Sequence, residues 1–286
     1  MTTASFPKLK RLVIICDGDG QISRIDATRF PALRHLVCMN PVKEPKPLIN
    51  GHLLNFPPLL SLSFDFDADS LWLSVLQACQ GTLISLELAI YEHPTMIQNT
   101  RLVFPRLICL DIGDWAERLG TWPLHLETPV LETYIEHAEG LGGSLMCPDA
   151  TTITQLRMNR VPESLPFPRV QLIQLSSRED ARPFLRHLSS NPAHFLQLET
   201  IEVRWWGEVP EDMVELVIAV NIKRKRAISL VYTSRLRDLH GMIRTQLVSF
   251  ASRSLSGPIT DAFPVWFQHA MPSRIGDMTR VISVKV

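Results

Sequence analysis

Asp17 and Asp19 are the first residues of this chain whose types and spacing suggest chemistry, because they lie two positions apart just after an apolar run at residues 12–16. Carboxylates in such an arrangement are ligands for divalent cations. With Gly20 as the central glycine of a calcium loop, ligand positions fall on Asp17, Asp19, Ser23 and Asp26. The first ligand position is then Ile15, and no flanking helices are expected. A turn after a strand, where Gly and Asp are favoured for backbone reasons, explains the same residues.

The segment also has a family resemblance. It is similar to the first motif of haloacid-dehalogenase-type phosphatases, an apolar strand followed by Asp-x-Asp-Gly-Thr. The resemblance implies that Asp17 is the nucleophile, that Asp19 is a general acid and base, and that Mg²⁺ neutralises the phosphoryl group. Gln21 stands in the place of the family's Thr, and the later Gly113-Asp114 pair lacks a further Asp for metal binding. A Mg²⁺-dependent phosphatase is therefore one alternative function.

Other reactive residue types give no pattern for a cofactor. The nine histidines show no metal-binding spacing, and the glycine-rich stretch 140–144 lacks the Lys of a phosphate-binding loop. The basic run 223–226 is either a nuclear import patch or a set of cations at a helix C-terminus. Aromatic residues do not alternate with basic ones as in single-strand nucleic-acid binders. We expect no cofactor, no metal and no nucleic-acid partner.

The elements that position these residues follow from a repeat. An aromatic-proline pair precedes Leu-x-x-Leu-x-apolar, first at residues 6–14 and again after Phe30, Phe56 and Phe104. The first Leu recurs at Leu9, Leu33, Leu59, Leu83, Leu107 and Leu131. The steps of 24, 26, 24, 24 and 24 residues lie in the range of about 20–29 residues that leucine-rich repeats use. Weaker copies are anchored at Ile153, Val170, Leu198, Ala227 and Val281.

The fold class that we predict is α/β, an irregular leucine-rich-repeat solenoid. The last two apolar residues of each phrase are two apart, so a strand directs both to one face. Stacked units bury that face in a continuous core. We expect a horseshoe with a parallel sheet on the concave side and helices on the convex side. One domain over residues 1–286 is predicted, with regular repeats in 1–150 and longer, irregular ones in 151–286. Apolar spacing predicts helices over residues 69–78, 178–188, 211–222 and 236–250.

Composition places the chain among globular proteins, since 45% of its 286 residues are apolar and 20% are charged. No apolar run approaches the ~20 residues of a membrane-spanning helix, and the first residues lack the apolar stretch of a signal peptide. Five cysteines without paired spacing indicate reduced thiols in an intracellular protein, either cytoplasmic or nuclear. The net charge is −6 over residues 1–150 and +6 over 151–286. This asymmetry is either scattered surface charge or the imprint of a polarised partner.

A protein ligand would contact the residues between the apolar strand positions. These outward positions line the predicted concave sheet, where Trp and Arg are typical of interaction hot spots. The candidate partner-binding residues are Arg11, His35, Ser63, Asp65, Glu87, Asp111, Arg157, Glu202, Arg204 and Trp206.

The phrases resemble the irregular leucine-rich repeats of fungal F-box proteins, and so does the late segment 209–226, a helix with a basic end that is followed by a strand at 228–230. In that family an F-box docks on a Skp1-type adaptor and the repeats select the protein to be ubiquitinated. Met1 precedes the first phrase by five residues, so the F-box itself is absent from this chain. The resemblance implies a non-catalytic protein-recognition scaffold, the substrate-recognition part of an SCF-type ubiquitin ligase adaptor if an F-box exists outside this chain. A truncated family copy without independent function is a further alternative.

Overall fold

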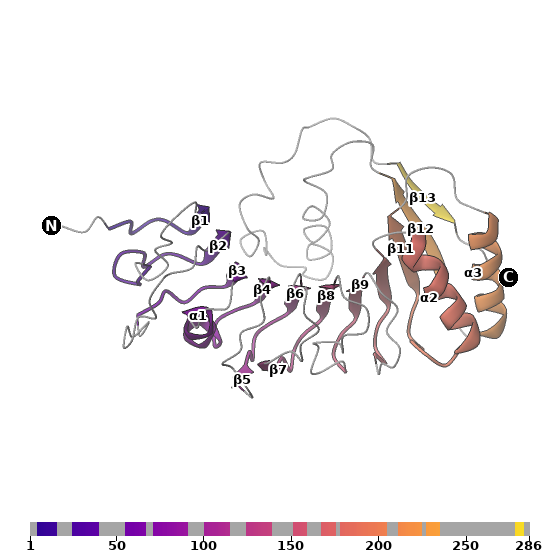
Figure 1. Cartoon of the computed structure of the whole chain (residues 1–286), viewed down its shortest axis with the longest axis horizontal. Coiled ribbons are helices and arrows are strands. Elements are labelled where there is room, and N and C mark those ends of the chain that lie inside the picture. Colours follow the sequence, from indigo (N-terminus) through magenta and orange to yellow (C-terminus); the bar gives the residue numbers. More distant parts are fainter. Residues whose placement is uncertain are drawn as a thin grey trace. The chain divides into compact units, whose positions relative to one another are not determined.

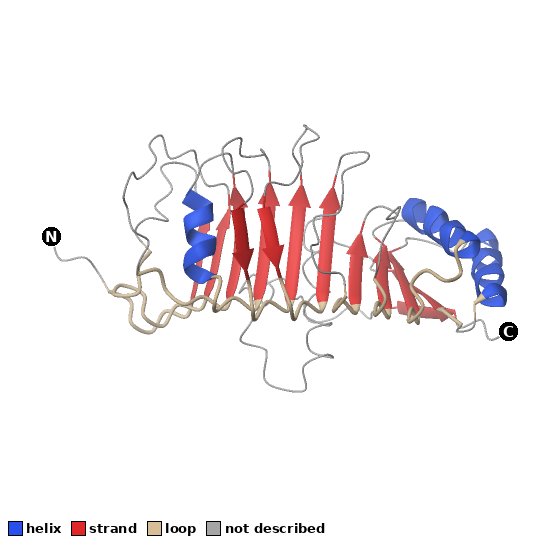
Figure 2. Ribbon diagram, turned by 90° about the horizontal axis from the view of Figure 1, so that it is seen from below, coloured by secondary structure: helices blue, strands red, loops and turns tan. Residues whose placement is uncertain are grey.

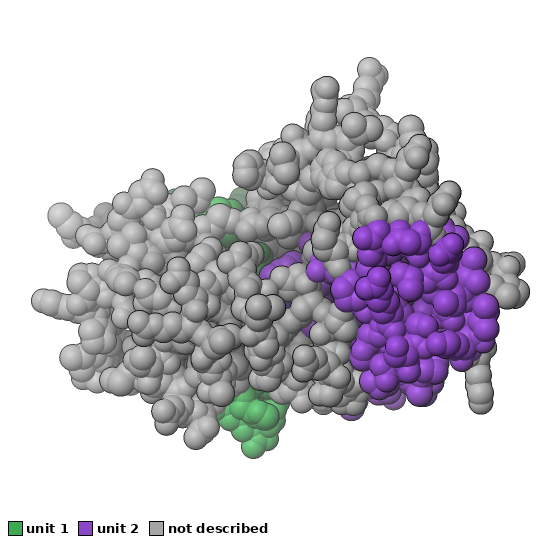
Figure 3. All heavy atoms as spheres, turned by 45° about the vertical axis from the view of Figure 1, so that its right-hand side comes forward, with its two compact units in different colours: residues 1–130, 139–148, 243–271 green, residues 131–138, 149–242, 272–286 purple. Residues whose placement is uncertain are grey.

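A computed structural model describes twelve segments of the chain. They are residues 5–15, 25–39, 55–66, 71–90, 100–114, 124–138, 151–158, 167–175, 178–204, 211–224, 227–234 and 278–282. The chain forms two compact units (Figure 3). The described residues of unit 1 lie within 1–130, and those of unit 2 lie within 131–138, 149–242 and 272–286.

Unit 1 contains five parallel strands that follow one another in chain order, as Figure 1 shows. They are β1 (Arg11–Ile15), β2 (His35–Met39), β3 (Ser61–Phe66), β4 (Ser85–Ile90) and β6 (Cys109–Asp114). The register pairs the second Leu of each phrase with its counterpart in the next strand, beginning with Leu12 and Leu36. Repeated parallel strands in this order form the solenoid that the sequence predicted.

The core of unit 1 is built from the apolar positions of the phrase. The second Leu is buried at Leu36, Leu62, Leu86 and Leu110, with at most 1% of its surface exposed. The last apolar position and the first Leu of these repeats are buried as well. Each such side chain contributes about 1.5–3 kcal/mol on leaving water, so the stack of repeats supplies the core that one repeat lacks.

Backbone hydrogen bonds fix the start of each strand. The carbonyl of Lys10 accepts from the N–H groups of Arg34 and His35 at 2.9 and 3.1 Å. The carbonyls of Arg34, Leu60 and Ile84 each accept from two consecutive N–H groups of the following repeat in the same way. Between each pair of neighbouring strands in the main sheet of unit 1, one backbone carbonyl thus accepts hydrogen bonds from two N–H groups.

The connections between the strands of unit 1 differ from one another. α1 (Leu71–Cys79) connects β3 and β4, as predicted for residues 69–78. β5 (Thr100–Val103) and β7 (Leu124–Glu127) instead form a second, two-stranded parallel sheet. Their residues alternate, because Leu102 and Leu126 are buried while Arg101, Val103 and His125 are exposed. We had not predicted these strands.

Unit 2 has five parallel strands and a sixth, antiparallel one. They are β8 (Thr133–Ala138), β9 (Gln155–Met158), β10 (Leu172–Leu175), β11 (Thr200–Arg204), β12 (Ser229–Ser234) and β13 (Met278–Ile282). The strands expected around Ile153 and Val170 are both present despite their 17-residue step. The last predicted copy, at Val281, is also a strand, but the expected parallel pairing was wrong, since β13 runs antiparallel to β12 and pairs Val281 with Val231. Alternating apolar residues fit either direction of pairing.

Two helices lie between strands of unit 2, and Figure 2 shows them in blue. α2 (Arg178–Ser190) precedes β11 and α3 (Glu211–Lys223) precedes β12, which confirms both predicted segments. α2 buries Phe184, Leu185 and Leu188, and α3 buries Met213 and Val217. The predicted helix over residues 236–250 lies outside the described residues. No helix in the described part of the chain is long and apolar enough to cross a membrane.

Candidate functional site

The register of unit 1 brings predicted polar positions together on the sheet face opposite the core. One row across neighbouring strands contains His35, Ser61, Ser85 and Cys109. The row two positions further along contains Val37, Ser63, Glu87 and Asp111. We call these eight residues the polar face of unit 1. Four of the ten predicted partner-binding residues therefore lie side by side.

Most of the polar face has little exposed surface. His35 and Ser63 are each 4% exposed and Asp111 is 8% exposed, whereas Ser85, Glu87 and Cys109 are half-buried. A sheet face that only collects solvated side chains would leave its serines and acids open to water. Ser85, Glu87 and Cys109 therefore keep more surface open to solvent than His35, Ser63 and Asp111 do.

The polar face contains two carboxylates, those of Glu87 and Asp111. Burial raises the pKa of the Cys109 thiol, and the Asp111 and Glu87 carboxylates raise it further, while a hydrogen bond with Ser85 opposes them. Register places Glu87 beside Asp111 on adjacent strands. No group of three or more His, Cys, Asp or Glu residues in the described segments is placed to hold a metal ion. Carboxylate and hydroxyl oxygens of this kind accept hydrogen bonds.

Unit 2 presents a more mixed set of polar residues on its own sheet. Arg157, Gln174 and Glu202 share one row across β9, β10 and β11. Gln174 Nε2 donates to Glu202 Oε2 at 2.7 Å, and Arg157 is only 4% exposed. The predicted residues Arg157 and Glu202 are thus two strands apart with an amide between them.

The remaining predicted residues are less fully defined. Arg11 is half-buried in β1, at one end of the row that contains His35. Asp65 and Arg204 are placed by the backbone of β3 and β11. Trp206 lies outside the described residues, as do Asp17 and Asp19 of the phosphatase-like motif.

A buried carboxylate that we did not predict lies on the core side of unit 2. Glu136 is fully buried, and the hydroxyl of Tyr134, equally buried, donates to its Oε2 at 2.5 Å. The phrase Leu131-x-x-Tyr134-x-Glu136 contains the signal, because it places an acid at the last inward position, where other repeats are apolar. A buried carboxylate requires such donors.

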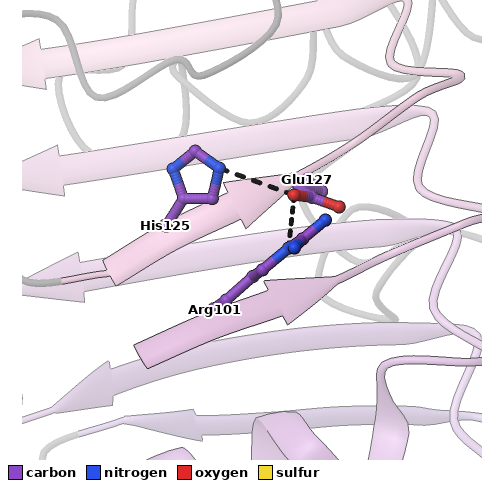
Figure 4. A network of polar contacts seen from close by, with 3 residues as sticks. All are labelled: Arg101, His125 and Glu127. Carbon is purple, nitrogen blue, oxygen red and sulfur yellow. Dashed lines mark ion pairs between the residues drawn. The ribbon is translucent and has the colours of Figure 1, made fainter. Parts of the chain in front are cut away.

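A second polar cluster lies on the exposed side of β5 and β7 in unit 1 (Figure 4). Glu127 Oε1 forms ion pairs with Arg101 Nε and, at 3.6 Å, with His125 Nε2. The hydrogen bond from Arg101, together with its charge, lowers the pKa of Glu127. The side chains of Arg101 and His125 are 66% and 59% exposed, so water screens these charges and the cluster adds little to stability.

The basic run at the end of α3 also has partners in unit 2. Lys223 Nζ donates to the carbonyl of Ser189 at 3.0 Å. Arg224 donates to three carbonyls of the loop that follows α2. Lys223 and Arg224, the first two cations of the run, therefore have structural partners within unit 2.

Comparisons of the chain with protein-family models, with curated proteins and with solved structures found no match. The assignment of a function therefore depends on the geometry described above.

Proposed function

We propose that this chain is a non-catalytic scaffold that recognises a protein ligand through the polar face of unit 1. The observation that carries the proposal is the register, which repeats polar side chains from strand to strand opposite a continuous apolar core. Repeat proteins use such extended rows as binding surfaces, because each repeat adds a similar position to the last.

The charge of the polar face indicates the chemistry of the ligand. Glu87 and Asp111 are neighbours and together disfavour a thiolate at Cys109. A segment that presents Lys or Arg would be attracted there, and its contacts would weaken as salt screens the charges. Ser85 and Cys109, also half-buried, would contribute hydrogen bonds beside Glu87.

Selection of a protein for ubiquitination is the more specific form of this proposal. It is based on the resemblance of the phrases to F-box-associated repeats, and it requires an F-box outside this chain to engage a Skp1-type adaptor. Co-expression with such an adaptor and an F-box donor tests it, since the assembled ligase should ubiquitinate whatever binds the polar face.

The phosphatase alternative has less support. Open α/β sheets bind substrates where the strand order reverses. The described strands of unit 1 follow chain order without such a reversal, and β1, which precedes Asp17, is the terminal strand. Mg²⁺-dependent hydrolysis of an aryl phosphate that Asp17→Asn abolishes would overturn the non-catalytic proposal.

A site-specific photo-crosslinking experiment tests recognition directly. A photoreactive residue at Ser85 samples the polar face, and one at Val103, on the exposed side of β5, is the matched control. We expect a protein captured from the native cell extract at Ser85 and not at Val103. The double variant Glu87→Gln, Asp111→Asn should weaken its binding about tenfold, equal to about 1.4 kcal/mol. Identical capture at both positions would refute the proposal.

A further inference from the structure

β1 lies at one end of the described strands of unit 1, and it differs from its neighbours in how many strands it pairs with. β2, β3 and β4 each pair with a described strand on both sides, whereas β1 pairs with β2 alone among the described strands. Among the described strands, the ladder of unit 1 therefore ends at β1.

The side chains of β1 remain more exposed than their counterparts in the next repeat. Leu12 is half-buried, whereas Leu36 has no exposed surface. On the opposite face Val13 is 40% exposed and Val37 is 2% exposed. Register pairs Leu12 with Leu36 and Val13 with Val37, so these are equivalent positions that differ only in what lies beside them.

The aromatic residue of the first phrase shows the same difference. Phe6 stacks on Phe30 with ring centroids 5.4 Å apart and an angle of 7° between the rings. Phe6 is 46% exposed and Phe30 is 8% exposed. One more strand at this end would bury Phe6, Leu12 and Val13 as β1 buries the residues of β2.

The backbone of β1 offers hydrogen-bonding groups to such a strand. The carbonyl of Lys10 points to β2, where Arg34 and His35 donate to it. Alternate residues of a strand direct their backbone groups to opposite sides, so the N–H and C=O of Val13 point away from β2. In the following repeat the N–H of Arg34 donates to the preceding carbonyl, but the N–H of Lys10 has no acceptor among the described residues.

Charge indicates which strand would fit. Lys8 and Lys10 are exposed beside Phe6. Both lysines precede β1, and lysines at a sheet edge discourage pairing with apolar strands of other copies. Their charge would attract the acidic residues of a strand that alternates apolar and acidic residues, and the apolar side chains of that strand would continue the row of Leu12.

We propose that β1 binds an extended acidic–apolar segment of a partner protein, which pairs in parallel with β1 and continues the ladder of unit 1. This is strand addition at a sheet edge, in which backbone hydrogen bonds supply affinity and alternate side chains supply specificity. It is independent of ligand binding at the polar face.

Fluorescence anisotropy of labelled peptides with the full chain tests the proposal. The probe is Glu-Leu-Asp-Val-Glu-Ile-Asp, and the control replaces each acid with its amide, Gln for Glu and Asn for Asp. We expect saturable binding of the acidic peptide and binding of the amide peptide that is weaker by at least about tenfold. Val13→Pro should abolish binding, because it removes the N–H that points away from β2. It leaves the hydrogen bonds between β1 and β2 in place, and proline is tolerated on an edge strand for that reason. Val13→Thr, which keeps the N–H, should bind normally.

A second variant keeps the test informative if Val13→Pro fails to fold. Lys8→Glu with Lys10→Glu lies outside the strand and should weaken binding of the acidic peptide to the level of the amide control. Equal binding by the wild type and both variants, or no binding of the acidic peptide at millimolar concentration, would overturn the proposal. Concentration-dependent dimers in sedimentation that Val13→Pro abolishes would also overturn it, since β1 would then pair with a second copy.

Discussion

Replacing Arg224 with Met should destabilise unit 2 far more than the same change at its neighbour Lys223. Arg224 is 8% exposed, and Lys223 is exposed although the two residues are adjacent at the end of α3. Both are cations near a helix C-terminus, and both donate to carbonyls that follow or end α2. The pair thus separates the effect of burial from that of charge.

The geometry of Arg224 gives the magnitude. Its Nη1 donates to the carbonyls of His194 at 2.7 Å and Pro192 at 3.3 Å, and its Nη2 donates to the carbonyl of Phe195 at 2.7 Å. A hydrogen bond to a charged group contributes about 1.5–3 kcal/mol net. Burial lowers the pKa of Arg224, and its Nε has no hydrogen-bond partner among the described residues. The burial of the charge and the unpaired Nε both offset part of the stabilisation. We therefore expect Arg224→Met to lower the free energy of unfolding by about 2–4 kcal/mol, mostly because it removes the two hydrogen bonds of 2.7 Å.

Urea unfolding of the full chain, followed by far-ultraviolet circular dichroism, measures this loss. Lys223→Met removes exposed contacts to Ser189 and should cost less than about 1 kcal/mol. Arg224→Lys keeps the charge but cannot reach all three carbonyls, so its free energy of unfolding should be intermediate. If Arg224→Met lowers the free energy of unfolding no more than Lys223→Met does, the buried hydrogen bonds do not stabilise unit 2 and the reasoning fails.

Three further predictions concern burial and charge. Burial, and then the charge of nearby His194, lowers the pKa of His187, so the unfolded chain binds more protons and stability should fall as the pH drops below about 6.5. His187→Gln should flatten that fall in urea titrations at pH 5 and 7. Leu86→Ala should lower the free energy of unfolding by about 2–5 kcal/mol because Leu86 is fully buried. Asp111→Asn should speed alkylation of Cys109 at pH 8.5, measured by peptide mass spectrometry, because burial and then the Asp111 carboxylate raise the pKa of that thiol; an unchanged rate would contradict the effect of the carboxylate.

The strands were predictable because the apolar phrase is a local signal. Two apolar residues separated by one position must share a face of a strand, and the 24-residue step places successive strands side by side. Leu36, Leu62 and Leu86 are buried as expected, and α2 and α3 begin at the predicted residues 178 and 211. Glu136 was predictable as well, since it interrupts an apolar position, although we did not identify it from the sequence.

Burial of the polar face was not predictable in the same way. Alternation indicates that His35, Ser63 and Asp111 point away from the core, and register confirms that they lie on one face. The alternation does not indicate what fraction of each side chain is buried by packing. That quantity depends on neighbours in other repeats, and the sequence has no local signal for it.

The sequence by itself determined the period, the direction of the strand side chains and the positions of the three described helices, because each depends on residues a few positions apart. The tertiary structure decided the antiparallel pairing of Val281 with Val231, the second sheet of β5 and β7, and the carbonyls that Arg224 binds. The partners of Arg224 lie about 30 residues earlier in the chain. Such contacts form only when folding brings distant segments together, and parallel or antiparallel pairing can satisfy the same alternation of residues.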